Sequence, residues 1–290
     1  MLTRPASADY DPSMSISSTA GLAERLGAAA DRRRIAVVPV RGVIGGALRT
    51  QDLVKTLDRA RENQHIRAVV LDIASPGGDA VASETLYLAV RRLAEAKPVV
   101  AWVRSVGASG SYYLACGATR ILAFPAALVG SIGVISVRPV LTDTLRRIGA
   151  RVRVTKTGPF KDLGAPWREP TEDDLAKERE LVDGMFRHFT TAVREARNFD
   201  DDSLARVTTG EVWLADRAVE LGLVDGLAEE DAAIEEAQRL AGLPRRKVVR
   251  LHPRRSPLQR LGIPGAGMGP PGPRWLVELE GWSRIPRLLS

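Results

Sequence analysis

The chain contains few of the residues from which disulfides and metal sites are built. Its 290 residues include one cysteine, Cys116, and three histidines, His65, His188 and His252, which are far apart in the sequence. A single cysteine excludes an intramolecular disulfide and a cysteine-based metal site, and three scattered histidines do not form a ligand set. We therefore expect neither a metal nor another cofactor.

Long hydrophobic runs are also missing. No stretch approaches the ~18 consecutive apolar residues that a membrane-spanning helix needs, and the N-terminal residues lack the apolar core of a secretory signal. Together these features predict a protein of the cytoplasm without a transmembrane anchor.

The positive charge is unevenly distributed. The chain carries a formal net charge of +7, but the segment from Pro244 onward contains ten basic residues and only two acidic ones. The rest of the chain is therefore close to neutral. We interpret 244–290, which is rich in glycine and proline, as a solvated basic tail. Weak contact of this tail with a membrane surface or an acidic partner is the alternative, and we expect no specific binding of nucleic acid.

The order of elements predicts an α/β fold. Apolar, β-branched runs at 34–46, 66–78 and 98–103 alternate with helical patterns at 50–64 and 80–96. Continuous apolar strands separated by helices are typical of βαβ units and a parallel sheet that is covered on both faces. We predict a loosely ordered segment at 1–33, a compact domain at 34–243 and the tail at 244–290.

The second half of the domain is expected to be richer in helix. The residues 151–158 alternate between polar and apolar and predict a further strand. A long amphipathic helix follows, and Thr171 and Asp174 have the spacing of a capping box at its start. Helical patterns then complete the compact region near residue 243.

Three glycine-containing turns follow three apolar strands. They are Ser75–Gly78 (SPGG), Gly107–Ser111 (GASGS) and Gly130–Gly133 (GSIG). Active sites of open α/β sheets gather where strands end and helices begin. Glycines allow backbone amides to turn outward as an oxyanion hole, and a serine that opens a helix can present its hydroxyl above the sheet. For any one of these turns, the alternative is that its glycines only allow the chain to pass from a strand to a helix.

A serine nucleophile needs a base, and lysine fits this sequence better than histidine. No histidine lies in a glycine-rich turn, so a Ser-His-Asp triad is disfavoured. Only six of the 42 basic residues are lysines. Lysine, unlike arginine, can lose its proton when it is desolvated. Lys161 lies in an apolar, glycine- and proline-rich loop, and it is the best candidate by environment. A surface lysine next to Asp162 is the alternative.

Four stretches, taken together, resemble the signal peptide peptidase A (SppA) family of serine proteases, which are relatives of the Clp protease and crotonase folds. They are ASPGGDA, VGASGSYYLACGATRILAFPAALVGSIGVI, GPFKDLGAPWRE and VWLADRAVELGLVDGL. The resemblance covers about 34–243 and implies repeated β-β-α units, a parallel sheet and C-terminal helices.

The resemblance also assigns roles to individual residues. It implies Ser109 as the nucleophile, rather than Ser111, and Lys161 as the general base. The amides of Gly78 and Gly110 match the oxyanion positions. The positions expected to orient the dyad or bind substrate are Ser131, Gly77 and Tyr112.

The resemblance further implies an endopeptidase with a Ser-Lys dyad that cleaves unstructured hydrophobic peptides such as signal-peptide remnants. It implies a homo-oligomeric ring of four to eight copies, in which a neighbouring copy can supply the lysine. The alternatives are a crotonase-like acyl-CoA enzyme and a non-catalytic scaffold of the same fold. The first would favour a catalytic carboxylate in the helix after GASGS, where none is present, and the second would not need both Ser109 and Lys161.

Overall fold

The computed structural model describes residues 33–252, and those from Arg34 onward belong to one compact unit. The segment 1–32 and the tail from residue 253 onward, for which we predicted loose order, lie outside the described residues. In chain order the elements are β1 (Arg34–Arg41), α2 (Thr50–Glu62), β2 (Ile66–Ser75), α3 (Ala80–Ala94), β3 (Val99–Ala108), α4 (Gly110–Ala115), β4 (Arg120–Ala123), β5 (Leu128–Gly130), α5 (Thr142–Arg147), α6 (Glu172–Arg197), α7 (Asp201–Val207), β6 (Val212–Leu214), α8 (Ala215–Glu220), β7 (Gly226–Leu227), α9 (Glu230–Leu240) and β8 (Val248–Arg250).

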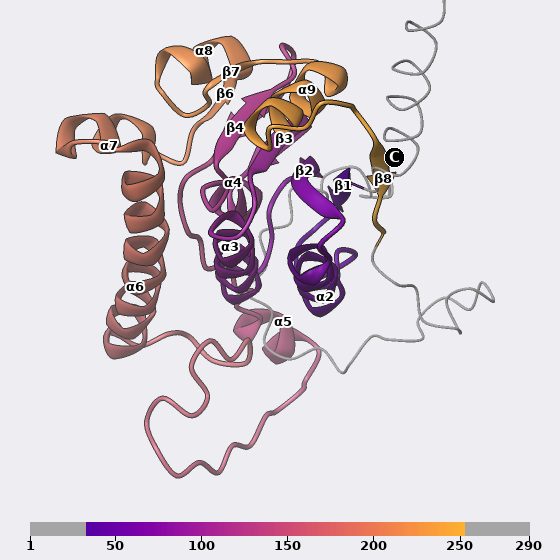
Figure 1. Cartoon of the computed structure of the whole chain (residues 1–290). Coiled ribbons are helices and arrows are strands. Elements are labelled where there is room, and N and C mark those ends of the chain that lie inside the picture. The colour runs from indigo at the N-terminus through magenta and orange to yellow at the C-terminus, as the bar shows by residue number, and fades with distance from the viewer. Residues whose placement is uncertain (1–32, 253–290) are drawn as a thin grey trace, which may run out of the picture. The chain divides into compact units, whose positions relative to one another are not determined.

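The strands form one sheet in the order β6-β5-β3-β2-β1-β8, and β4 pairs with both β3 and β7. All pairings are parallel except that of β5 with β6. Helices cover the sheet, and α6 runs beside α3 and α4 (Figure 1). The predicted α/β class, with a parallel sheet and C-terminal helices, is confirmed.

Both faces of the sheet are buried, which explains why its strands read as continuous apolar runs. In β2, Val69, Leu71 and Ile73 pack into the core beneath α2, α3 and α4. The alternate residues Ala68 and Val70 pack on the other face, beneath α9. Since side chains alternate along a strand, each face takes every second residue.

The structure departs from the sequence-based prediction in two places. The residues 151–158 are not a strand but an extended segment without sheet partners among the described residues, and Val152 and Val154 are 50% and 42% exposed. A strand needs a neighbouring strand to complete its hydrogen bonds, and residues 33–252 offer none there. The sheet also continues beyond the expected domain end at 243, because β8 pairs with β1.

The long helix α6 begins as predicted. The Thr171 side chain accepts a hydrogen bond from the Asp174 amide, and the Asp174 carboxylate accepts one from the Thr171 amide, which completes the capping box. Within residues 33–252, no helix combines the length and the apolar character needed to cross a bilayer.

Candidate active site

The three glycine-containing turns meet at the carboxyl ends of neighbouring strands. The register of the sheet places Ser75 of β2 opposite Gly107 of β3, and Ala108 of β3 opposite Gly130 of β5. The Ser109 amide donates a 2.8 Å hydrogen bond to the Gly130 carbonyl. The turns that are far apart in the sequence therefore form one continuous surface.

Ser109 has a backbone conformation that favours glycine. Its φ is 52° and its ψ is −124°, at the junction between β3 and α4. Non-glycine residues seldom adopt positive φ, and they tend to do so where function requires it. Among the described residues only Ser131 (φ 51°) and Asn198 (φ 51°), which caps the end of α6, share this feature. Two serines expected at the active site are thus both strained.

The Ser109 hydroxyl is not held by a hydrogen bond from the described residues. The residue is 7% exposed, and its hydroxyl forms no hydrogen bond with any other residue in 33–252. It is not one of the fully buried, unpartnered side-chain atoms in that range. The hydroxyl is therefore available to a ligand in the adjoining pocket.

Three glycines around Ser109 are required by close backbone approach. A Cβ on Gly77 would lie 2.6 Å from the Gly110 amide nitrogen and 2.9 Å from Ser109 Cβ. A Cβ on Gly78 would lie 2.7 Å from the Ile44 amide nitrogen, and one on Gly110 would overlap the side chain of Ser83. No side chain fits at these positions without displacing the turn that carries Ser109 or the turn that faces it.

The amides of Gly78 and Gly110 are free donors. Neither donates a hydrogen bond to another residue in the described part of the chain. The two turns lie close together, since a Cβ on Gly110 would be 3.5 Å from the Gly78 nitrogen. The neighbouring backbone groups already have hydrogen-bond partners. The Gly77 carbonyl accepts from the Ile44 amide, and the Asp79 amide donates to the Ile44 carbonyl. Two unpaired donors beside a serine hydroxyl have the character of an oxyanion hole.

Ser111 has a structural role. Its hydroxyl is fully buried and donates to the carbonyls of Ser75 (2.6 Å) and Ala108 (2.8 Å), which ties the ends of β2 and β3 together. The hydroxyl is therefore already satisfied and faces away from solvent.

Tyr112 does not lie where substrate contact was expected. Its ring is fully buried and its hydroxyl donates to the Leu223 carbonyl at 2.7 Å. The first turn of α4 points Tyr112 into the core, and Tyr113, one residue later, lines the pocket instead. Cys116 is no competing nucleophile, because burial raises the pKa of its thiol to about 12.

An apolar pocket opens beside Ser109. It is bounded by the turn residues Gly78, Ser109 and Gly110 and by residues of α3, α4, α6 and the segment after β5. The residues from these elements are Ala80, Val81, Ser83, Glu84, Tyr113, Gly133, Val134, Ile135, Leu181, Val182, Met185 and Phe189. Tyr113 stacks between Tyr87 and Phe189, with ring centroids 5.0 and 4.7 Å apart. The sequence analysis missed the α6 residues, although their spacing of one helical turn is an apolar stripe that could have indicated them.

Lys161 lies apart from this pocket. It is exposed in the loop between α5 and α6, and it is not one of the residues that line the pocket. Figure 1 shows that the segment between β5 and α6 forms a wide excursion from the domain. Within 33–252, no hydrogen bond or ion pair engages the Lys161 ammonium group, whereas Lys156 donates to Asp162 and to the Pro159 carbonyl. Ser131, by contrast, directly follows Gly130, which contacts Ser109.

No group of three histidine, cysteine or acidic side chains within residues 33–252 is arranged to hold a metal ion.

A serine at a strained strand-to-helix turn beside free amides is characteristic of α/β serine hydrolases. The chain belongs to peptidase family S49, because the sequence model described as "Peptidase family S49" matches residues 91–244, more than half of its length. The resemblance to the SppA family is confirmed, and the chain is a serine peptidase.

Three relatives illustrate the match. The slr0021 protein of Synechocystis sp. is 34% identical over 217 residues, which cover 75% of this chain and 78% of that protein. The chloroplastic serine protease SPPA of Arabidopsis thaliana is 31% identical over 240 residues, covering 78% of this chain and 35% of that protein. Protease 4 of Salmonella typhi is 33% identical over 186 residues, covering 63% of this chain and 30% of that protein. The matched part is therefore about a third of the two larger relatives.

Proposed function

We propose that this chain is an endopeptidase in which Ser109 attacks the peptide bond and Lys161 acts as general base. The observation that carries the proposal is the combination at Ser109 of a strained backbone, an unengaged hydroxyl and two free amides facing one apolar pocket. Strain of about 1–3 kcal/mol at a non-glycine residue is retained where it serves function. Lys161 is favoured over Lys156 because the Lys156 ammonium group is already paired.

The reaction proceeds through an acyl-enzyme. Neutral Lys161 accepts the Ser109 proton while Oγ bonds to the substrate carbonyl carbon, and the amides of Gly78 and Gly110 stabilise the resulting oxyanion. The carbon–nitrogen bond then breaks, and the protonated lysine gives its proton to the leaving amine. Water, deprotonated by the same lysine, then attacks the ester carbon. The bond between this carbon and Ser109 Oγ breaks, the acid product leaves, and the lysine returns the proton to Oγ.

In the proposal, the lysine reaches Ser109 of a second copy of the chain. Two observations support this. Lys161 is exposed and outside the Ser109 pocket of its own chain. The segment around it carries apolar side chains that a single chain leaves in water, namely Ile135, Val137, Val140, Ile148, Val152, Val154 and Phe160. Apolar surface gathered in this way is typical of an interface. A ring of four to eight copies would place each lysine at a neighbour's serine.

The substrates in this proposal are unstructured hydrophobic peptides. The pocket beside Ser109 is lined mainly by aliphatic and aromatic side chains, including Leu181, Met185 and Phe189. Burial of an aliphatic side chain there contributes about 1.5–3 kcal/mol to binding. Signal-peptide remnants have this character, and a cytoplasmic location remains part of the proposal.

The test is complementation between two inactive variants. Ser109→Ala and Lys161→Ala are each assayed with a fluorogenic apolar peptide, alone and after co-expression. Each variant alone should lose at least ~1000-fold in kcat, because the nucleophile or base is missing. Co-expression should restore a measurable fraction of activity if the lysine acts between chains. Activity that stays absent on mixing would place the dyad within one chain, and full activity of Lys161→Ala alone would refute the dyad.

The same assay gives a pH dependence. The rate of the wild-type enzyme should rise with pH, because a general base accepts the serine proton only in its deprotonated form. Lys156→Met is the matched control, because it removes a lysine of the same loop, and it should retain the shape of this profile.

A further inference from the structure

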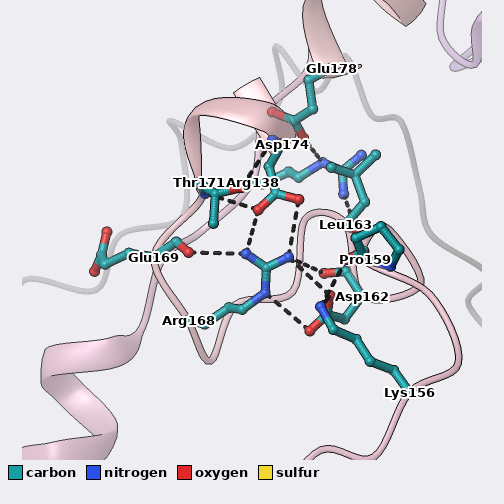
Figure 2. A network of polar contacts seen from close by, with 10 residues as sticks. All are labelled: Arg138, Lys156, Pro159, Asp162, Leu163, Arg168, Glu169, Thr171, Asp174 and Glu178. Atoms are coloured by element: carbon teal, nitrogen blue, oxygen red, sulfur yellow. Dashed lines mark hydrogen bonds and ion pairs between the residues drawn. The ribbon is translucent and has the colours of Figure 1, made fainter. Parts of the chain in front are cut away.

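A group of charged residues fastens the Lys161 loop to the start of α6 (Figure 2). At its centre is Arg168, whose guanidinium bridges two carboxylates. Its Nε and Nη2 each lie 3.0 Å from an oxygen of Asp162, and its Nη1 and Nη2 both donate to Asp174, the latter at 3.1 Å. Arg168 thus joins the residue next to Lys161 to the first turn of the helix.

These carboxylates are shielded from water although the loop is on the surface. The Asp162 and Asp174 side chains are 8% and 4% exposed, and that of Arg168 is 25% exposed. The hydrogen bonds from Arg168, followed by that from Lys156, lower the pKa of Asp162 to about 2. Arg168 and then the Thr171 amide hold the pKa of Asp174 well below its usual range. Both carboxylates therefore remain charged and paired at neutral pH.

The residue that follows Asp162 is held as well. The Arg138 Nη1 donates to the Leu163 carbonyl at 2.8 Å. The Arg138 Nε lies 2.6 Å from Glu178 Oε1, an ion pair that lacks the geometry of a hydrogen bond. Within the loop, the Lys161 amide donates to Gly158 and the Leu163 amide to Phe160. Lys161 is therefore an exposed side chain of a turn whose next two residues, Asp162 and Leu163, are linked to α6.

The helix α6 connects this turn to the rest of the molecule. Its first turn holds the Asp174 partner of Arg168, and its later residues Leu181, Met185 and Phe189 line the Ser109 pocket. The frame that holds the turn and one wall of the same chain's pocket thus belong to one helix of 26 residues, from which the exposed lysine is presented to the second copy.

We propose that Arg168 is a positioning residue that holds the Lys161 turn on α6 in the geometry that proton transfer requires. The inference rests on the proposed role of Lys161. Arg168 does not contact the reacting atoms, and it acts through Asp162 and Asp174. Its planar fork bonds both carboxylates at once, which a lysine ammonium cannot reproduce.

The experiment compares Arg168→Ala, Arg168→Lys and the control Arg146→Ala. Arg146 is an exposed residue of α5 that pairs only with Asp143 among the interactions described. The measurements are kcat and KM with the fluorogenic peptide, and amide hydrogen exchange across 156–168. Misplacement of a base by about 1 Å costs on the order of 100-fold in rate. We expect Arg168→Ala to lose about 10- to 100-fold in kcat with little change in KM, with faster exchange across the turn.

Two further results separate positioning from a general loss of folding. Free guanidinium should restore part of the kcat of Arg168→Ala, because it can occupy the same site between Asp162 and Asp174, whereas Arg168→Lys should remain impaired. If Arg168→Ala does not fold, Asp174→Asn keeps an acceptor for the Thr171 amide and removes the charge, and it should show a smaller fall in kcat. An unchanged kcat, or a fall in kcat without faster exchange and without rescue, would overturn the inference.

These variants distinguish failure of the Arg168 inference from failure of the proposed function. If Lys161→Ala keeps full activity, the dyad is refuted whatever Arg168 does. If Lys161→Ala is inactive while Arg168→Ala retains wild-type kcat, the dyad stands and only the positioning role of Arg168 is refuted.

Discussion

The two halves of the candidate site are built in different ways. The half that carries Ser109 lies at the ends of sheet strands. Buried side chains, and glycines at positions with no room for a side chain, hold its backbone in place. The half that carries Lys161 lies in an exposed segment, held by charged groups on the first turns of α6. Packing inside one chain thus completes the turn of Ser109 and its two free amides, whereas the Lys161 side depends on ion pairs and on exposed surfaces.

The largest effect is expected from filling the tight space beside Ser109. Gly110→Ala should lower the free energy of unfolding by about 2–3 kcal/mol, because the new methyl overlaps Ser83 and lies 2.8 Å or less from that side chain. Denaturant unfolding followed by circular dichroism measures the change. Adding Ser83→Ala removes the hydroxyl that causes the worst overlap and should recover part of the loss. An unaffected stability of Gly110→Ala would contradict the close packing described.

A smaller effect on stability, in the stabilising direction, is expected when Ser109 is replaced by glycine rather than by alanine. Ser109→Gly should be more stable than Ser109→Ala by about 1 kcal/mol, since glycine accepts a φ of 52° and a ψ of −124° and alanine does not. Both variants lack the hydroxyl and should be inactive, so the difference reports backbone strain alone. Thermal unfolding of the two variants is the measurement, and equal stability would mean that Ser109 is not strained.

The ion pairs of the Lys161 segment should make stability depend on acidity. The pKa of Asp162 falls from its usual 3.8 to about 2 on folding, through Arg168 and then Lys156. The charged Asp162 carboxylate therefore contributes its full stabilisation of the folded state above pH 3.8, and this stabilisation is lost as the pH falls towards 2. The difference in melting temperature between wild type and Asp162→Asn should be constant near neutral pH and shrink across that window. A constant difference down to about pH 2 would argue against the pairing.

The smallest effect on folding is expected in the apolar part of the same segment. Replacing Ile148, Val152 and Val154 together by serine should change the free energy of unfolding by about 0.5 kcal/mol or less, because these side chains are 71%, 50% and 42% exposed. Sedimentation should instead show weaker assembly, with loss of peptidase activity. The control Val69→Ser, in the buried sheet, should reverse this pattern and destabilise the fold.

The sequence predicted the parts of the fold that local patterns determine. Buried apolar strands and the glycine turns after them identified the sheet and the surface around Ser109, and Thr171 with Asp174 identified the start of α6. It could not separate Tyr112 from Tyr113, because only the folded chain brings the Leu223 carbonyl to the Tyr112 hydroxyl and so shows which ring enters the core. It also predicted a strand at 151–158, where alternation is present but the described part of the chain provides no strand to pair with it.

The ionic network around Arg168 was not foreseen for a similar reason. Asp162 was seen only as a neighbour of Lys161, and no sequence pattern signals that one guanidinium bridges it to Asp174 across a loop. The α6 wall of the pocket was missed because an apolar stripe predicts burial without identifying what it faces.

The burial of Cys116 makes the molecule convenient for spectroscopic labelling. Its thiol is 6% exposed and titrates near 12, so maleimide reagents at neutral pH should leave it unmodified in the native protein. A cysteine introduced at an exposed position such as Val152 would then be the sole reactive site in the native chain. A spin label at this position in each copy would test whether the Lys161 segments of two copies approach each other in the proposed oligomer.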